Sequence, residues 1–327
     1  MNSNIQKIKL LELKKLNLPK DASFPNFSGN PNETWGIIKN NTLEAVCSFW
    51  LNNLPWQGAI ASSLGHFFTN DAKSGQEILL VVLNRLQELG SSYVIGPMNG
   101  NTWQSYRLVT HSEQYPPFFL EYFTPKEWPE IFKSVGFEPI AHYSSARSSR
   151  IEYIDQSAEK FKLKKEILGL VIRPFGLSRA KEELKSVHRL SLESFSGNFL
   201  YTSILLEDFI NLYEKIIPYI EPKYFLLAEH KGELVGFIFA IPDLLQKQSG
   251  KIIDTLIVKT VAKKPGRQYA GLGNYLVHAI HQSAAIDGYK NIIHALMFDD
   301  NVSRVISQKS AETIRKYALY GKSLGFK

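Results

Sequence analysis

The sequence contains the same order of predicted elements twice, and this internal repeat constrains the fold more than any single motif. In the second half, apolar residues recur at helical spacing over residues 272–286, and Gly288 and a buried strand ending near Met297 follow. In the first half, residues 74–89 have the same pattern, followed by Gly90 and a strand ending at Met98. Glycine directly after a helical pattern favours termination of the helix. The repeat therefore predicts two copies of one α/β unit.

The length agrees with two units, because 327 residues are more than one hydrophobic core usually supports. Residues 156–167 are polar and charged compared with the segments on either side, as domain linkers often are. We therefore expect a linker there, between an N-terminal domain over residues 1–155 and a C-terminal domain over residues 168–327.

Composition indicates a soluble globular protein, with 44% hydrophobic and 21% charged residues. A single cysteine, Cys47, excludes an internal disulfide and fits a reducing compartment. No segment has the 18 or so consecutive apolar residues of a membrane span, and we expect a cytoplasmic protein without a membrane partner. The net charge of +7 favours anionic partners, but the basic residues are scattered, which argues against nucleic acid.

The remaining pattern fills in each half. In the second half we expect a strand, two helices, a hairpin turning at Gly232, a strand, a helix and a buried strand, over residues 168–175, 178–195, 205–220, 224–242, 251–265, 272–287 and 291–298. In the first half we expect two paired strands, a helix and a strand, over residues 44–53, 58–70, 74–90 and 91–98.

A glycine turn between the strand and the helix of the second half is the main candidate for a functional motif. It reads Arg-Gln-Tyr-Ala-Gly-Leu-Gly-Asn over residues 267–274. A dinucleotide-binding turn needs a third glycine and an acidic residue about 20 positions on, and neither is present. A Walker phosphate loop needs Gly-Lys-Ser/Thr, which is also missing. Two interpretations remain at this point, a turn that only begins a helix and a turn that binds an anion.

The combination Gln268-x-x-Gly271-x-Gly273, between a strand and an amphipathic helix, resembles the acetyl-CoA site of the GNAT superfamily of N-acetyltransferases. In the first half, Phe132-x-x-x-Gly136-Phe137 looks like the helix-to-strand signature that closes a GNAT domain. The corresponding turn over residues 70–78 lacks the acetyl-CoA pattern. The resemblance implies an α/β (α+β) fold of two tandem GNAT-like domains, each a mixed, mostly antiparallel sheet flanked by helices. It also implies that the first domain does not bind acyl-CoA.

The resemblance further implies acetyl-CoA as the acyl-donor substrate, and no metal. Backbone groups of Val261 and Ala262 would meet the pantetheine and stabilise an oxyanion at the carbonyl. The pyrophosphate would lie on the turn, because small residues admit it and free N–H groups at the helix start face it. The residues of this turn are Gln268, Tyr269, Ala270, Gly271, Leu272, Gly273 and Asn274. Asn301 would either contact the cofactor or cap a short helix.

Acid and base residues are less well marked. An amine must be neutral to attack, whereas a lysine-type amine has a pKa of about 10.4. Asp254, before the glycine turn, is either the general base or a solvated strand-end residue. The tyrosine that usually follows the family's asparagine by seven residues is Gln308 here, so Tyr317 and Tyr320 are the candidates for general acid. We expect both in a late strand, rather than in a closing helix and turn.

The leading hypothesis from the sequence is an acetyl-CoA-dependent N-acetyltransferase. It would transfer an acetyl group to a primary amine of an unidentified acceptor by direct attack in a ternary complex. One alternative is a tRNA-dependent aminoacyltransferase, since tandem GNAT-like domains also build that class. Another is a non-catalytic acyl-CoA-binding module, which the missing tyrosine at position 308 favours. The sequence does not indicate an oligomeric state.

Overall fold

A computed structural model describes residues 4–13, 15–18, 27, 29–112, 115–151, 156–299 and 311–325. We call residues 4–151 the N-terminal half and residues 156–325 the C-terminal half. The N-terminal half contains β1 (Asn4–Lys7), α1 (Leu10–Leu13), β2 (Glu33–Lys39), β3 (Thr42–Trp56), β4 (Ala59–Thr69), α2 (Ala72–Glu88), β5 (Tyr93–Gly96), β6 (Leu108–Ser112), α3 (Trp128–Ser134) and β7 (Glu138–Ser148).

The C-terminal half repeats this order with additional helices. Its elements are α4 (Gln156–Leu168), β8 (Val171–Pro174), α5 (Ala180–Phe195), α6 (Leu206–Glu214), β9 (Phe225–His230), β10 (Glu233–Pro242), α7 (Leu244–Gln248), β11 (Thr255–Lys263), α8 (Leu272–Ile286), β12 (Asn291–Phe298) and β13 (Glu312–Ser323). The hairpin, the two central strands of each half and the helix between them all form where the sequence predicted them.

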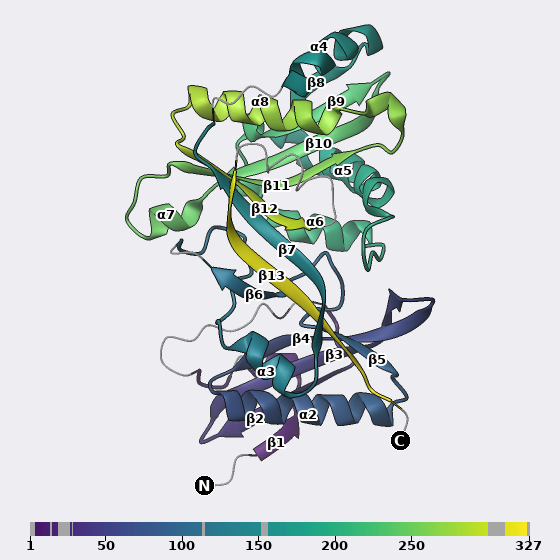
Figure 1. Cartoon of the computed structure of the whole chain (residues 1–327), viewed down its shortest axis with the longest axis vertical. Coiled ribbons are helices and arrows are strands. Elements are labelled where there is room, and N and C mark those ends of the chain that lie inside the picture. The colour runs from purple at the N-terminus through teal and green to yellow at the C-terminus, as the bar shows by residue number, and fades with distance from the viewer. Residues whose placement is uncertain are drawn as a thin grey trace.

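The strands form one mixed, mostly antiparallel sheet that runs through both halves (Figure 1). Among the described residues it has thirteen strands, in the order β1-β2-β3-β4-β5-β13-β7-β12-β11-β10-β9-β8, and β6 pairs with β13 beside this path. In the C-terminal half, α4 and α8 cover one face of the sheet, and α5 and α6 cover the other (Figure 1). In the N-terminal half, α2 and α3 cover one face.

The two halves exchange strands at their junction. The late strand β13 of the C-terminal half lies between β5 and β7, both of which belong to the N-terminal half. Strand β7, in turn, pairs with β12 of the C-terminal half. The expectation of a late strand for Tyr317 and Tyr320 is confirmed, because both lie in β13. The domain limits 1–155 and 168–327 stay a prediction. They divide the sequence, whereas the sheet contains strands of both halves.

Helix α4 corrects the expectation of a linker. Residues 156–167 are polar enough to suggest a connecting segment, yet they form a helix that packs on α8. Two buried side chains on one side, Ala158 and Phe161, anchor it, while Lys160 and Lys162 are exposed. Because the apolar stripe of this helix is so narrow, its sequence is polar overall and resembles that of a loop. Packing against α8 stabilises the helix.

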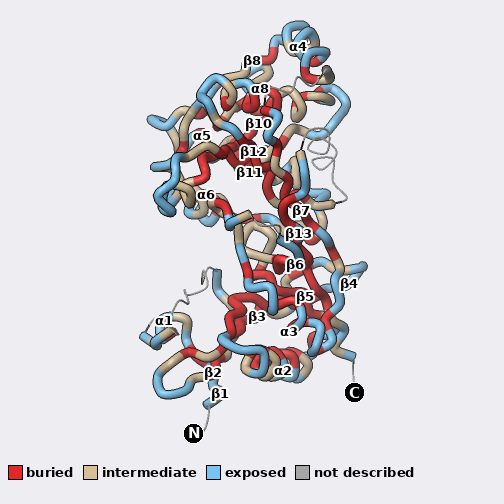
Figure 2. The backbone as a smooth tube through the Cα atoms, turned by 60° about the vertical axis from the view of Figure 1, so that its left-hand side comes forward, coloured by how far each residue is buried: buried red, intermediate tan, exposed pale blue. Residues whose placement is uncertain are grey.

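Buried residues line the sheet in both halves (Figure 2), and among the described residues they form four hydrophobic clusters. Helix α2 shows why these segments fold as they do. Asp71 caps its first turn by accepting a hydrogen bond from the Ser74 amide, and apolar side chains at helical spacing face the sheet. No helix of the described residues is long and apolar enough to cross a membrane.

Candidate functional site

The central parallel strands of the C-terminal half separate partway along their length. β11 and β12 pair only from Thr255 and Asn291 to Val258 and His294. Beyond that point β11 stays with β10, whereas β12 stays with β7. We call the gap between residues 259–263 and 295–298 the C-terminal splay. Along it, no strand pairs with this edge of β11 in the described structure, although the carbonyl of Lys263 accepts from the Ser194 hydroxyl at 2.8 Å. The other backbone groups that point away from β10 are available to a ligand.

The equivalent place in the N-terminal half is closed by the chain itself. β4 and β5 pair in parallel only at Ser62–Ser63 and Val94–Ile95, and then they separate as well. There, however, the Met98 amide donates to the carbonyl of Leu64 at 2.6 Å. The His66 amide donates to Oδ1 of Asn99 at 2.8 Å. The segment after β5 thus occupies the edge that stays open in the C-terminal half.

The glycine turn connects the end of β11 to the start of α8. It contains a short 3-10 turn over Arg267–Tyr269, and Gly271 is the residue before the first turn of α8. The side chains of Tyr269 and Leu272 are buried, so only their backbone can face a ligand, whereas Gln268 and Ala270 are exposed. The first N–H groups of α8 have no partner within the helix, and the helix dipole makes this end attractive to anions.

The two glycines of the turn serve different purposes. Gly271 has φ +97°, a left-handed conformation that disfavours other residues, so the backbone itself requires a glycine there. A side chain at Gly273 would meet only Cγ1 of Val261, at an ordinary 3.7 Å. Neither packing nor conformation therefore requires glycine at 273. An open position without a side chain beside free helix N–H groups fits a phosphate that approaches the backbone closely.

Helix α4 forms one wall of this turn, which sequence reasoning missed. Phe161 packs so closely over Gly271 that a Cβ there would lie 2.9 Å from its ring. Nζ of Lys164 donates to the carbonyls of Arg267 and Ala270, each at 3.3 Å. The signal available in the sequence was the single phenylalanine among the lysines of residues 156–167.

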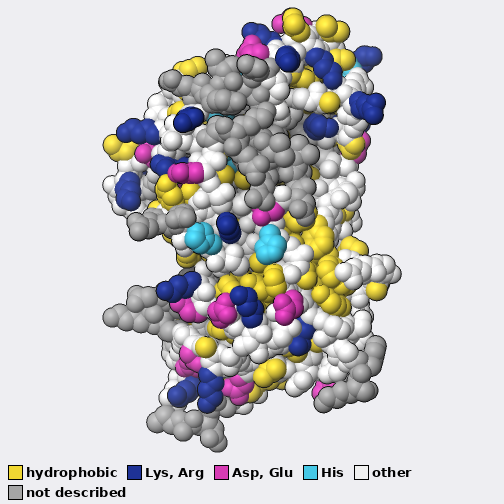
Figure 3. Space-filling model, viewed as in Figure 1, with side chains coloured by type: hydrophobic (Ala, Val, Ile, Leu, Met, Phe, Trp, Pro, Cys, Tyr) yellow, Lys and Arg dark blue, Asp and Glu magenta, His cyan; other side chains and the backbone are white. Residues whose placement is uncertain are grey.

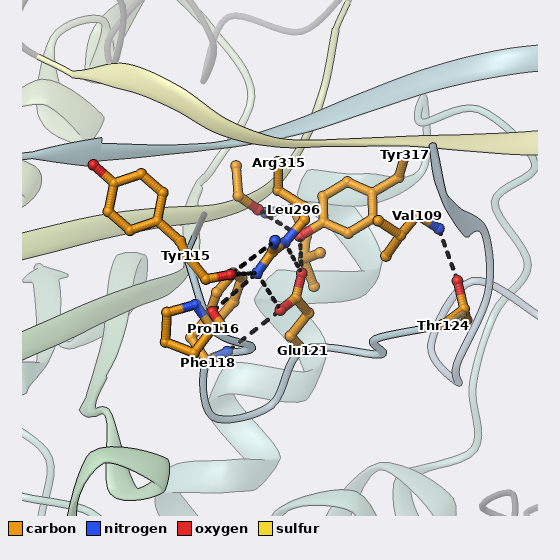
Figure 4. Close-up of polar contacts among 10 residues, drawn as sticks. Val109, Tyr115, Pro116, Phe118, Glu121, Thr124, Leu296, Arg315 and Tyr317 are labelled. Carbon is orange, nitrogen blue, oxygen red and sulfur yellow. Dashed lines mark hydrogen bonds and ion pairs between the residues drawn. The ribbon is translucent and has the colours of Figure 1, made fainter. Parts of the chain in front are cut away.

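A buried ion pair lies beneath the C-terminal splay, on a loop of the N-terminal half (Figure 4). Arg315 of β13 and Glu121 pair at 2.9 Å, and both side chains are fully buried. Two carbonyls of the same loop, those of Tyr115 and Pro116, also accept from the guanidinium of Arg315. Glu121 and Arg315 are far apart in the sequence, and the strand exchange of β13 brings them together.

Tyr317 completes this network. Its hydroxyl donates to Oε1 of Glu121 at 2.6 Å and lies 3.1 Å from the hydroxyl of Ser145. Ser145 in turn accepts from the amide of Leu296, in the irregular part of β12 at the splay. Glu121 also accepts from the Phe118 amide, at 3.3 Å. Both of its oxygens are therefore occupied, and it is not a free base.

Two further cations lie beside this network. Lys259 is the first residue of β11 beyond the pairing with β12, and it is skipped in the pairing with β10. Its amine donates to the Leu120 carbonyl at 2.9 Å. Burial, more than the nearby positive charge of Arg107, lowers the pKa of Lys259 to about 7. Arg107 is buried, and one of its N–H groups donates to the Leu296 carbonyl at 3.3 Å.

Asp254 lies at the opposite end of β11 from the splay. Its carbonyl accepts from the amides of Lys290 and Asn291, which ties together the starts of β11 and β12. Its carboxylate accepts from Gln246 and Thr255. Burial raises the pKa of Asp254, but hydrogen bonds from Gln246, Thr255 and Asn291 outweigh it and hold the pKa below its ordinary value. This position and a lowered pKa argue against a general base.

The two tyrosines lie in different parts of the molecule. Tyr320 packs in the core of the N-terminal half, with its ring 6.0 Å from that of Phe132, and does not face the C-terminal splay. Burial raises the pKa of Tyr320 to about 12. Tyr317 lies near the splay, but burial and the Glu121 charge raise the pKa of its hydroxyl, which makes it a weak acid. Asn301 lies outside the described residues.

The structure therefore brings together Val261, Ala262 and the glycine turn, and separates them from Asp254 and Tyr320. Sequence reasoning missed Lys259, Arg107 and Glu121. A lysine inside the apolar run Leu-Ile-Val-Lys-Thr-Val over residues 256–261 was a usable signal for the first of these. Among the described residues, no group of three His, Cys, Asp or Glu side chains is arranged to hold a metal ion.

No protein-family model and no curated protein matches this sequence. Several solved structures match its fold. A tandem GNAT protein from the clavulanic acid biosynthesis pathway aligns over 100% of both chains, with a TM-score of 0.53 and 11% identity. A GCN5-related N-acetyltransferase from Sphaerobacter thermophilus aligns over 89% of this chain and 80% of its own, with a TM-score of 0.51 and 9% identity.

A third match is the GCN5-related glucosamine N-acetyltransferase region of a fungal multi-domain β-N-acetylglucosaminidase. It covers 89% of this chain but only 33% of the fungal protein, with a TM-score of 0.55 and 9% identity. At such identities the likeness shows the fold alone. The chain has the fold of the GCN5-related N-acetyltransferases in tandem, and the fold expected from the sequence is confirmed.

Proposed function

We propose that this chain, with its tandem GCN5-related N-acetyltransferase fold, transfers an acetyl group from acetyl-CoA to a primary amine of an acceptor. The chemistry would take place at the C-terminal splay. The observation that carries the proposal is the difference between the two halves. Among the described residues, no strand pairs with the β11 edge beside a helix N-terminus with a glycine turn, whereas the β4 edge is occupied by Met98 and Asn99. The N-terminal half would accordingly bind no acyl-CoA.

The residues of the chain fit such a ligand. The backbone of residues 268–274 and the side chain of Gln268 would hold the pyrophosphate, and the open space at Gly273 supports this. The backbone of Val261 and Ala262 would orient the acyl end along the open edge of β11. When bound, acetyl-CoA supplies the thioester from which the acceptor amine takes the acetyl group, and the thiol of CoA is the other product.

Neither Asp254 nor Tyr320 has a role in this proposal, because both lie away from the splay. Tyr317 has a positioning role, since its hydroxyl is committed to Glu121. Together with Arg315, it would hold the loop over residues 115–121 against the splay. Lys259 lies at the splay itself, where burial lowers the pKa of its amine to about 7.

Equilibrium binding of acetyl-CoA to the full chain, measured by calorimetry, tests the proposal. We expect one site per chain, and loss of binding when Gly271 and Gly273 are both replaced by valine. Absence of binding by the unmodified protein would rule out the proposed function. A second substitution, Gly65→Val at the closed edge of the N-terminal half, tests stability and not affinity, since a Cβ there would meet Met98 and Asn99.

Turnover requires a second measurement. Release of free thiol from acetyl-CoA, measured with a panel of polyamines, amino acids and peptides, separates an enzyme from a binding module. We expect thiol release that depends on one class of amine. Tight binding without release under any acceptor would favour the non-catalytic alternative, and a gel shift with tRNA would favour the aminoacyltransferase.

A further inference from the structure

The buried charges next to the C-terminal splay do not balance locally. In the part of the chain that the structure describes, three basic side chains lie around the carboxylate of Glu121: those of the buried Arg107 and Arg315, and that of the half-buried Lys259. A further carboxylate, that of Asp243, interacts electrostatically with Glu121 and accepts from the amides of Phe119 and Leu245. Burying a charge without a partner is costly, so an excess of buried cations is uncommon unless an anion joins them.

The hydrogen bonds show which cations lack an anion. Glu121 accepts two bonds from Arg315, one from Tyr317 and one from the Phe118 amide, so its acceptor capacity is used. Arg107 and Lys259 each donate to a single carbonyl, those of Leu296 and Leu120. A guanidinium carries five N–H groups and an ammonium three. Neither residue has an ion pair in the described structure.

Arg107 is held in a fixed orientation. Its guanidinium carbon lies 4.0 Å from the ring centre of Tyr106 and 4.3 Å from that of Tyr143. Only 6% of the residue is exposed, and its backbone has φ +73°, an uncommon conformation outside glycine. Aromatic rings cover the faces of the guanidinium and leave its N–H edge for hydrogen bonds, the arrangement that suits a carboxylate.

Lys259 adds the second positive group from the strand that carries Val261 and Ala262. Its charge is disfavoured by burial and by Arg107, so an anion placed between the two would restore it. On the face shown in Figure 3, lysines and arginines stand in separate groups and form no continuous basic patch. Arg107 and Lys259 supply two positive groups beneath the splay, which suit a small anionic group.

We propose that Arg107 and Lys259 bind a carboxylate of the acceptor, and that the acceptor is an amine that also carries a carboxylate, as an amino acid does. This inference rests on the proposed function and names its substrate class. The carboxylate would fix the acceptor beside the open edge of β11, where its amine would meet the acyl donor. Arg107 is thus a specificity-determining residue, and Glu121, Arg315 and Tyr317 hold the loop that faces it.

Matched pairs of acceptors test the proposal. The panel contains the common amino acids and, for each, the amine without the carboxylate, such as phenylalanine and phenethylamine. We expect acetylation of the amino-acid member at a kcat/KM at least tenfold higher. In Arg107→Gln, KM for the amino acid should rise about 10- to 100-fold, the usual worth of a charged hydrogen bond. The dissociation constant for acetyl-CoA should stay unchanged.

Binding without acetyl-CoA gives a readout that does not depend on turnover. Calorimetric titration with the best amino acid, in buffers of different ionisation enthalpy, should show proton uptake near pH 7 as Lys259 becomes charged. The other titratable and charged groups around this position are those of Glu121, Arg315, Tyr317 and Tyr143. Uptake should disappear in Lys259→Met. Arg107→Lys, which keeps the charge and loses the planar fork, should recover part of the affinity.

Three results would overturn the inference. The first is equal or better use of the amines without a carboxylate. The second is selectivity for the carboxylate that survives in Arg107→Gln. The third is acetyl-CoA binding with no acetylation of any amino acid. Arg85→Gln, which removes a paired arginine on α2 in the N-terminal half, is the control for general effects of losing an arginine. Absence of acetyl-CoA binding would instead count against the proposed function.

Discussion

Replacement of Gly273 by glutamate should raise stability and weaken acetyl-CoA binding, two effects of opposite sign from one side chain. Gly273 is the second residue of α8, and a Cβ there meets only Val261 at 3.7 Å. Replacing glycine in a helix by a good helix former gains up to about 0.8 kcal/mol. A carboxylate in the first turn adds roughly 0.3–1 kcal/mol through the helix dipole. We expect a gain of about 1 kcal/mol in the free energy of unfolding.

The same carboxylate would oppose a pyrophosphate on the turn. At a separation of about 6 Å and an effective dielectric constant of about 20, two like charges repel by about 3 kcal/mol. That figure corresponds to a loss of affinity of about 100-fold. Urea denaturation measures the first effect, and calorimetric titration with acetyl-CoA at low salt measures the second. Added salt should recover part of the lost affinity, since the repulsion is screened.

A matched control is Ala72→Glu in the first turn of α2, an exposed position on a helix of the N-terminal half. It makes the same charge change at another helix N-terminus and should leave acetyl-CoA affinity unchanged. Undiminished affinity in Gly273→Glu would refute the assignment of the turn. A fall in stability of more than about 1 kcal/mol, the size of the expected gain, would show that the space at Gly273 is not open.

Three further substitutions test the site's energetics. Lys259→Met should stabilise the fold most below pH 7 and progressively less toward pH 10. The reason is that the pKa of Lys259 is lower in the folded chain than in the unfolded chain, so the free-energy cost of burying this amine fades as the unfolded chain also loses the proton. Urea denaturation across this pH range measures the difference, and a pH-independent difference would contradict the assignment. Glu121→Gln should lower the free energy of unfolding by about 3–5 kcal/mol, because Arg315 is left buried without a carboxylate. Glu130→Gln, in an exposed ion pair, should lower it by less than about 1 kcal/mol. Equal losses would argue that the pair of Glu121 and Arg315 is not buried in solution. Phe161→Ala should lower the free energy of unfolding by about 3–5 kcal/mol and increase the hydrogen exchange of the turn amides, because Phe161 packs on Gly271. Unchanged exchange rates of these amides would mean that α4 does not support the turn.

The local elements of this protein could be predicted because their signals are local. The helix pattern before Gly288 and the hairpin turn at Gly232 each lie within one short window. Helix α4 could not be assigned in this way, since Phe161 and Ala158 are its two buried side chains among those described and its partner α8 lies more than a hundred residues on. Its structure depends on a contact that no local pattern contains.

The candidate site shows the same division. The glycine turn is a contiguous motif, and the structure places it beside the splay as expected. Arg107, Glu121 and Lys259 are single residues in separate segments, and the strand exchange of β13 brings the first two against the third. Asp254 was assigned because it precedes the same strand, but sequence order does not tell which end of a strand faces a ligand.

The position of β13 has a consequence for how the chain can acquire its structure during synthesis. The ribosome produces β5 and β7 early, whereas β13, the strand that lies between them in the sheet, begins 164 residues after β7 ends. The first half therefore waits for β13 during synthesis. Until then the first half presents two unpaired strand edges, which are templates for pairing with other chains. A ribosome-bound chain ending before β13 should therefore remain protease-sensitive in its first half and should become protected only when β13 emerges.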